Sequence, residues 1–293
     1  MTKTALPNNM GYLLGFTLSI AGLSLVLSWL CLPWVRLSWW MTFRRMVSIS
    51  AGTMLLIFMW RVHKQSLRTL GFGSWREGKR RLLQGVLLGF GAVLAIGGVY
   101  LATGACQMTI PANQLRALRV VGGFFPIAIM IAVLEELIFR GYVLQKLLAY
   151  STALGVTGSS AAYALVHLRP PFEWPGSAMQ LTGLFILGCV LAWSYLRSRQ
   201  LYLAVGLHAG FAYFAVANKL IVAFTAPSSI RWLVGTSRLV DGVVGWVMLG
   251  GLAWSLSHWV KLDVPRPLFR SSDAERPDGV PQAALASAPQ SPS

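Results

Sequence analysis

An uncharged run that begins at Val120 ends in the segment Leu134-Glu135-Glu136-Leu137-Ile138-Phe139-Arg140-Gly141-Tyr142. A charged side chain at bilayer depth costs about 2.5–3.5 kcal/mol on insertion scales, so a helix that served only as an anchor would not carry two adjacent carboxyl groups. Glu136 and Arg140 are four residues apart, share a helix face and can pair. Glu135 points about 100° away from Glu136. The segment therefore predicts one carboxylate held by arginine and one available for chemistry.

The composition around this segment is that of a membrane protein. Of 293 residues, 55% are hydrophobic and 12% are charged, and the mean hydropathy is +0.60. The apolar runs are long and lack the alternation of strands, which predicts an all-α polytopic transmembrane bundle of about eight spans. We expect these spans near residues 11–34, 41–60, 82–104, 121–148, 156–169, 177–196, 201–223 and 240–260.

The flanks of the bundle are of different composition. Residues 1–10 form a short polar lead, and residues 11–261 form the bundle. The first run is long and has no small-residue cleavage signature, so it is interpreted as a retained helix rather than a signal peptide. Residues 262–293 combine proline, serine, alanine and charge without periodicity, which predicts a disordered tail.

The net charge of +16 is interpreted as a signal for the orientation of the protein in the membrane rather than as evidence of a nucleic-acid partner. Lysine and arginine collect in cytoplasmic loops of membrane proteins, and a basic stretch at residues 61–81 joins the second and third spans. That stretch is interpreted as a cytoplasmic loop, with an amphipathic helix on anionic headgroups as the alternative. Together with an even number of spans, the charge bias predicts both termini in the cytoplasm, and the plain multi-span architecture favours a bacterial plasma membrane.

The deep ionisable groups come from three predicted helices. They are two carboxyl groups, two imidazoles and one guanidinium: Glu135, Glu136, Arg140, His167 and His208. Counted from the loops at one face, the two histidines and the first carboxylate lie at depths of roughly 12–18 Å, so they can meet in one layer. Polar groups in membranes face the bundle interior, which favours convergence over separate structural roles.

Such a layer suits hydrolysis. A carboxylate near two histidines can deprotonate water and then pass the proton to a leaving group. The same groups, Glu135, His167 and His208, can instead bind Zn²⁺ with a position left for water. The zincin signature H-E-x-x-H is absent, and so is G-x-S-x-G. The three cysteines are widely spaced, so neither a thiolate metal site nor a disulfide framework is expected.

Three motifs resemble those of one family. Residues 135–141 look like the E-E-x-x-x-R motif of the CPBP intramembrane proteases, which include type II CAAX prenyl endopeptidases and bacterial Abi-type immunity proteins. Residues 163–167 are similar to the family's F-x-x-x-H motif, with Tyr163 in place of phenylalanine. Residues 206–211 resemble the start of its H-x-x-x-N motif. The resemblance covers about residues 65–220, in the family's order.

The resemblance implies an intramembrane endopeptidase. In that case Glu135, helped by His167, activates the attacking water, and Glu136 and Arg140 support the site by pairing. His208 binds water, metal or the developing oxyanion. The implied partners are a peptide or membrane-protein substrate and the lipid bilayer. The resemblance leaves open whether a zinc ion or a metal-free glutamate carries the reaction.

The third motif departs from the family pattern. Ala212 stands where the pattern has asparagine, so a hydrogen-bond donor is missing, and the loss of one such donor can cost about 10²–10³ in rate. Tyr213 is one candidate replacement, and Asn218, about 9 Å further along the helix, is another. Ala212 motivates a second hypothesis, a weakly active or inactive scaffold or immunity protein. A proton-coupled transporter ranks third, because matched broken helices are not evident.

Overall fold

The computed structural model describes residues 8–109, 111, 113–168, 170–236 and 238–259, and it confirms an all-α polytopic bundle. The main helices are α1 (Asn9–Cys31), α2 (Trp39–Ile57), α3 (Trp75–Ala102), α4 (Gln114–Glu136), α6 (Thr152–Val166), α7 (Gly176–Ser198), α8 (Leu201–Ile221) and α10 (Val243–Trp259). Shorter elements are η1 (Phe58–Val62), η2 (Leu67–Leu70), η3 (Leu137–Leu144), α5 (Gln145–Leu148), η4 (Ser228–Ile230), α9 (Arg231–Val234), and the strands β1 (Cys106–Met108) and β2 (Val222–Phe224).

The apolar helices lie where the sequence predicts spans. Within the described residues, six are long and apolar enough to cross a membrane: Asn9–Cys31, Trp39–Val62, Trp75–Ala102, Gln114–Leu148, Gly176–Ser198 and Leu201–Ile221. The predicted fifth and eighth spans correspond to two shorter apolar helices, Thr152–Val166 and Val243–His258. A helix of 15 residues is about 22 Å long, less than a bilayer core. The fifth predicted span is therefore a short helix.

The helix starts follow the chemistry of the residues that precede them. Asn8, Ser38, Asn113 and Ser151 each accept a hydrogen bond, through the side chain, from a backbone N–H of the first turn. These caps satisfy donors that have no partner inside the helix. They fix where α1, α2, α4 and α6 begin and so set the depth at which each helix presents its side chains.

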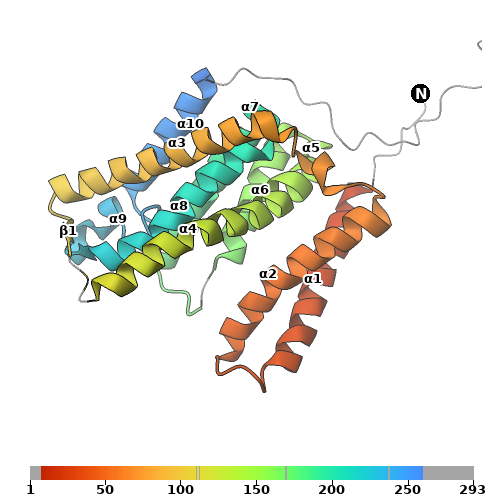
Figure 1. Cartoon of the computed structure of the whole chain (residues 1–293), viewed down its shortest axis with the longest axis horizontal. Coiled ribbons are helices and arrows are strands. Elements are labelled where there is room, and N and C mark those ends of the chain that lie inside the picture. The colour runs from red at the N-terminus through yellow and green to blue at the C-terminus, as the bar shows by residue number, and fades with distance from the viewer. Residues whose placement is uncertain (1–7, 110, 112, 169, 237, 260–293) are drawn as a thin grey trace, which may run out of the picture.

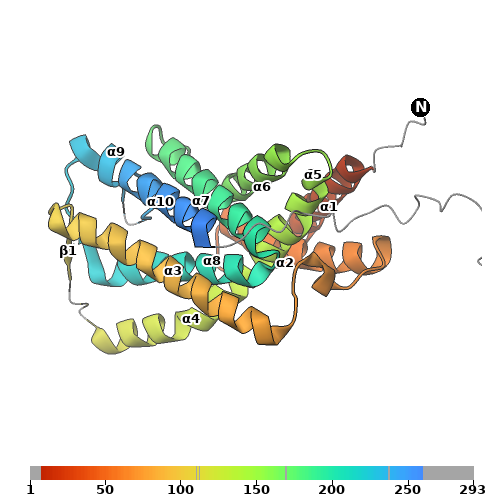
Figure 2. The same cartoon turned by 90° about the horizontal axis from the view of Figure 1, so that it is seen from above.

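Connections between neighbouring elements mark the two ends of the bundle. At one end β1 pairs antiparallel with β2, with Gln107 opposite Ala223. At the other end the Leu201 N–H donates to the Gly71 carbonyl at 2.9 Å. The first contact joins the chain after α3 to the chain after α8. The second joins the segments that precede these helices, so α3 and α8 run in the same direction (Figures 1 and 2).

The closest helix pair in the core is α3 with α8, and glycines allow that approach. A Cβ added at Gly89 would lie 2.8 Å from the Leu207 carbonyl oxygen, and one added at Gly206 would collide with the Leu82 carbonyl. Both helices carry a G-x-x-x-G pattern, at residues 85–89 and 206–210. Small residues at this spacing let membrane helices pack backbone to backbone. The α8 residues Leu201–Phe211 are buried as a result.

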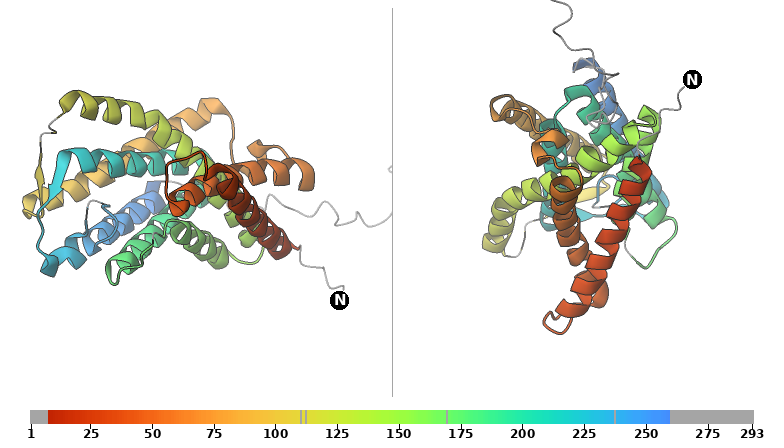
Figure 3. Two further views of the ribbon diagram at one scale, coloured as in Figure 1. Left: turned by 90° about the horizontal axis from the view of Figure 1, so that it is seen from below. Right: turned by 90° about the vertical axis from the view of Figure 1, so that its right-hand side faces the viewer.

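The first two helices stand apart from this core. α1 and α2 form an antiparallel hairpin that approaches the rest of the bundle beside α5 and η3 (Figures 1 and 3). Phe16 and Met59 are buried at that contact, and the Phe16 ring lies 4.6 Å from the ring of Tyr142. Large apolar side chains such as Leu14, Leu18 and Trp29 are exposed on the hairpin, which suits contact with lipid.

The structure describes only part of the predicted flanks. Residues 1–7 of the polar lead and the tail 262–293 lie outside the described residues, so the disordered tail stays a prediction. Arg140 and Lys146 follow the apolar run of the fourth predicted span, and both are buried in the bundle rather than exposed in a loop. The charge argument for orientation therefore rests on the basic residues of the loops. The stretch 61–81 contains η2 and the first turns of α3.

Candidate active site

The Glu–Glu–Arg segment lies where α4 gives way to a π-helix. α4 ends at Glu136 and η3 continues to Leu144. A π-helix has a wider turn than an α-helix, and short π segments are frequent at functional sites. Arg140 Nη1 donates to Glu136 Oε1 at 2.9 Å, and both side chains are fully buried. The predicted pair is thus present, and it neutralises two charges inside the bundle.

Arg140 is also held from α6 and α7. Its Nη2 donates to the Gly188 carbonyl at 3.1 Å, and its guanidinium lies 4.7 Å from the centre of the Tyr163 ring. The cation–π contact and the carbonyl compensate for burial of the charge. Arg140 therefore connects α6, α7 and η3, and it places Glu136 next to α8.

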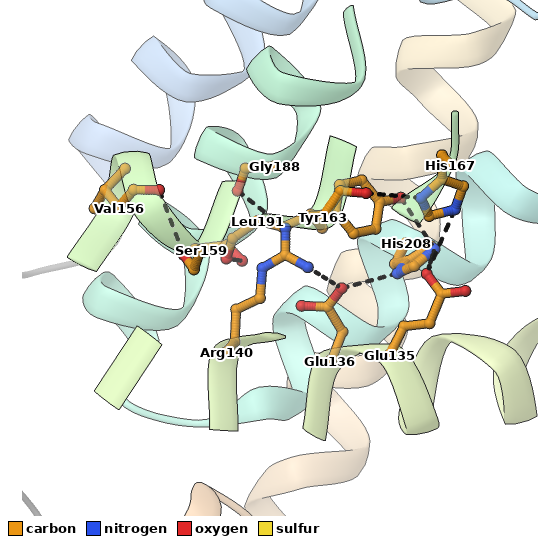
Figure 4. A network of polar contacts seen from close by, with 11 residues as sticks. Glu135, Glu136, Arg140, Val156, Ser159, Tyr163, His167, Gly188, Leu191 and His208 are labelled. Carbon is orange, nitrogen blue, oxygen red and sulfur yellow. Dashed lines mark hydrogen bonds and ion pairs between the residues drawn. The ribbon is translucent and has the colours of Figure 1, made fainter. Parts of the chain in front are cut away.

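His208 in α8 contacts both carboxyl groups. Its Nδ1 lies 2.8 Å from Glu136 Oε1, and its Nε2 lies 3.6 Å from Glu135 Oε2 (Figure 4). Because Glu136 also accepts from Arg140, it is the acceptor and His208 Nδ1–H is the donor. In a neutral imidazole with this tautomer, Nε2 keeps its lone pair. His208 thus presents an acceptor to Glu135.

His167, at the end of α6, has the same tautomer. Its Nδ1 lies 2.8 Å from the Tyr163 carbonyl oxygen, so Nδ1–H must donate. Its Nε2 lies 3.8 Å from Glu135 Oε2. The two Nε2 atoms and the carboxylate oxygen therefore converge in one place (Figure 4), and the structure brings together Glu135, His167 and His208 as the depth argument expects.

Glu135 Oε2 lies near both histidines without a direct hydrogen bond to either. The distances of 3.6 and 3.8 Å are too long for hydrogen bonds, and Oε2 is a buried atom with no hydrogen-bond partner among the described residues. Glu135 and His167 are 24% and 27% exposed, whereas Glu136 is fully buried. The two adjacent carboxyl groups thus have different environments: Glu136 is enclosed by its partners, whereas part of the Glu135 side chain is accessible.

The donor types, two imidazoles and a carboxylate, are those of catalytic zinc sites. Zinc requires nitrogen and oxygen ligands at about 2.0–2.2 Å from one point. Within the described part of the chain, no group of three or more His, Cys, Asp or Glu side chains has an arrangement that could hold a metal ion. The side chains present therefore do not fit a metal without moving, and zinc stays a prediction.

Two contacts were not foreseen from the sequence as parts of the site. The Gly188 carbonyl on α7 carries no sequence signal. Tyr163 was noted only as a substitution in a motif, yet its hydroxyl oxygen lies 3.5 Å from His208 Nε2. The suggested substitute Tyr213 instead packs its ring against Phe90 and Phe125, at centroid distances of 5.6 Å.

The comparisons agree with the motifs. Residues 117–214 match the family model described as type II CAAX prenyl endopeptidase Rce1-like. The matched segment includes all five predicted site residues, so the family resemblance is confirmed there. No curated protein and no solved structure matches the chain.

Proposed function

Because residues 117–214 match the Rce1-like family, we propose that this protein is an intramembrane endopeptidase that hydrolyses a peptide bond with a water activated by Glu135 and His167. The observation that carries the proposal is the convergence of Glu135 Oε2 with the Nε2 atoms of His167 and His208. Glu135 and His167 Nε2 can each accept one of the two hydrogen bonds that a water molecule donates, and His208 borders the same point.

The reaction follows from that arrangement. Glu135 takes a proton from the water as the oxygen attacks the carbonyl carbon, and His167 Nε2 accepts the water's other hydrogen bond. The tetrahedral intermediate then collapses as the proton passes from Glu135 to the leaving nitrogen. The C–N bond breaks, and the products are a carboxylic acid and an amine. His208 borders the site of the water, and Glu136 keeps the His208 ring in place.

The proposed substrate is a peptide or a membrane-protein tail reached within the bilayer. The family description names prenylated CAAX sequences, in which a lipid is attached to a cysteine near the C-terminus. A site inside a bundle of apolar helices suits a substrate whose lipid partitions into the membrane. We propose a multi-pass protein of a bacterial plasma membrane with both termini in the cytoplasm.

The first test is cleavage of a fluorescence-quenched prenylated peptide ending in a C-a-a-X sequence, in detergent or liposomes. Glu135→Gln keeps the shape of the side chain but removes the base, so we expect cleavage to fall by about 10²–10⁴-fold. Glu173→Gln, at an exposed carboxyl group outside the site, is the matched control and is expected to cleave at the wild-type rate. Normal cleavage by Glu135→Gln would sink the proposal.

Metal content distinguishes the two mechanisms. Metal analysis of the purified protein is compared between the wild type and His208→Ala. About one zinc per chain, lost in the variant, would establish a metalloprotease. Absence of stoichiometric metal from an active wild type would support Glu135 as a metal-free base.

Ala212 favours a second candidate, a scaffold or immunity protein that keeps the fold with little or no catalysis. The Glu135→Gln, His208→Ala double variant separates the two functions. If a cellular phenotype of the wild type persists in this variant, the scaffold function is supported. If the phenotype is lost while the protein still inserts, the protease is supported.

A further inference from the structure

The proposed reaction needs a hydrogen-bond donor beside Glu135 that neither of the two histidines supplies. Hydrolysis of an amide develops negative charge on the carbonyl oxygen, and donors aimed at that oxygen stabilise the transition state. Ala212 has no donor in its side chain. The Nδ1–H groups of His167 and His208 are already engaged by the Tyr163 carbonyl and by Glu136. In their neutral forms both imidazoles therefore offer only an acceptor to the substrate.

The Tyr163 hydroxyl is a donor at the right place. Its oxygen lies 3.5 Å from His208 Nε2, which in turn lies 3.6 Å from Glu135 Oε2. The side chain is 2% exposed, so the hydroxyl lies in the water-poor environment in which a hydrogen bond to an oxyanion is strongest. Figure 4 shows the Tyr163 ring between Arg140 and the two histidines.

The ring of Tyr163 is held on several sides. The Arg140 guanidinium lies 4.7 Å from its centre, Phe139 meets it edge to face at 5.4 Å, and His167 lies 4.7 Å away. With the ring fixed, the O–H bond can still rotate about the bond from ring to oxygen. The proton can thus turn from His208 Nε2 to a substrate oxygen without any movement of the ring.

We propose that the Tyr163 hydroxyl donates a hydrogen bond to the developing oxyanion and so fills the role for which Ala212 has no group. This inference rests on the proposed protease function and adds a catalytic residue to it. The substrate carbonyl lies with its carbon next to the water at Glu135 and its oxygen towards Tyr163. The free hydroxyl bonds to His208 Nε2 in the absence of substrate.

The test is Tyr163→Phe, which keeps the ring and its packing and removes one oxygen. We expect kcat on the prenylated peptide to fall about 10²–10³-fold, with little change in KM. Tyr202→Phe is the matched control, because the Tyr202 hydroxyl donates to the Gly73 carbonyl at 3.2 Å, away from the site. The control is expected to keep wild-type activity.

A second variant separates catalysis from structure. Ala212→Asn places a carboxamide one helical turn after His208, at a position that is only partly buried. In the Tyr163→Phe background we expect this substitution to restore much of the lost kcat. A purely structural role of the hydroxyl predicts lower stability and no rescue by an amide on another helix.

Binding of a phosphinate analogue of the peptide gives an independent readout, because its tetrahedral oxygens mimic the oxyanion. Tyr163→Phe should weaken binding of the phosphinate and leave binding of the uncleaved amide unchanged. Wild-type kcat and phosphinate affinity in Tyr163→Phe would overturn the inference and leave the protease standing. A wild type that neither cleaves the peptide nor binds the phosphinate would overturn the proposed function on this substrate, and the inference with it.

Discussion

At the scale of single residues, the buried Glu136–Arg140 pair is the most consequential contact in the site. Removal of one partner leaves the other charge buried without compensation, which typically costs about 3–5 kcal/mol. Arg140→Met should therefore lower the free energy of unfolding by that amount and abolish activity, because Glu136 no longer orients His208. Thermal or denaturant unfolding in detergent measures the loss.

The control for Arg140→Met is Arg119→Met, at an exposed position of the same α4 helix. A surface arginine contributes little, so this variant should unfold like the wild type. Equal stability of the two variants would contradict a structural role for the Glu136–Arg140 pair.

A second residue-scale prediction concerns His63, which follows the second span. Burial, followed by the positive charge of Lys146, lowers its pKa from 6.5 to about 4. His63 Nε2 lies 3.1 Å from the Tyr142 hydroxyl oxygen, and the Tyr12 ring packs edge-on at 5.1 Å. Between these pKa values the unfolded chain binds more protons than the folded one. The contribution of His63 to the free energy of unfolding therefore rises with pH.

Thermal unfolding from pH 6.5 down towards 4 tests that effect. The wild type should lose stability relative to His63→Gln as the pH falls, because glutamine does not titrate. His258→Gln, at an exposed histidine of α10, should track the wild type. A difference between wild type and His63→Gln that is constant with pH would refute the assigned pKa shift.

At the scale of elements, the position of His208 depends on how closely α8 approaches α3. A Cβ at Gly89 would lie 2.8 Å from the Leu207 carbonyl oxygen, and this backbone atom cannot move without moving α8. Gly89→Ala should therefore destabilise the bundle by about 1–3 kcal/mol and reduce activity by shifting His208 relative to Glu135.

Gly91→Ala is the matched control in the same helix, since a Cβ there meets nothing within 4 Å. Unfolding and peptide cleavage are measured side by side for the two variants. If both alanine variants unfolded and cleaved the peptide like the wild type, the claim that the close packing of α3 on α8 positions His208 would be contradicted.

At the scale of the whole molecule, successive apolar helices carry the chain from one end of the bundle to the other. The strand pair at residues 106–108 and 222–224 lies at one end, and the Gly71–Leu201 contact lies at the other, beside the basic segment 61–81. Loops rich in lysine and arginine lie preferentially on the cytoplasmic side of the membrane. We expect the Gly71 end to be cytoplasmic and the strand pair to face outward.

Reporter fusions test this orientation. Green fluorescent protein fused after Trp259 should fluoresce, and alkaline phosphatase fused after Gly104 should be active in the periplasm. Exchange of the reporters should abolish both signals. The opposite pattern would reverse the proposed topology without affecting the site.

The pairing of Glu136 with Arg140 follows from a four-residue spacing, and the structure contains it although the segment is a π-helix rather than an α-helix. The fifth predicted span, at residues 156–169, is already short in the sequence, and the structure moves it a few residues earlier, to Thr152–Val166. A role for Tyr163 was not foreseen, since one hydroxyl in an apolar helix carries no pattern.

The sequence alone determined that the bundle is surrounded by lipid, that the fold is all-α, and which five polar residues lie deep in the predicted helices. Hydropathy measures transfer into lipid directly, and a charged group in an apolar run is costly enough to stand out. Only the tertiary structure decided which carboxylate faces the histidines, which imidazole nitrogen is free and which hydroxyl lies beside them. These depend on rotation and contact between helices that are distant in sequence, where distances of a few ångströms separate a structural group from a reactive one.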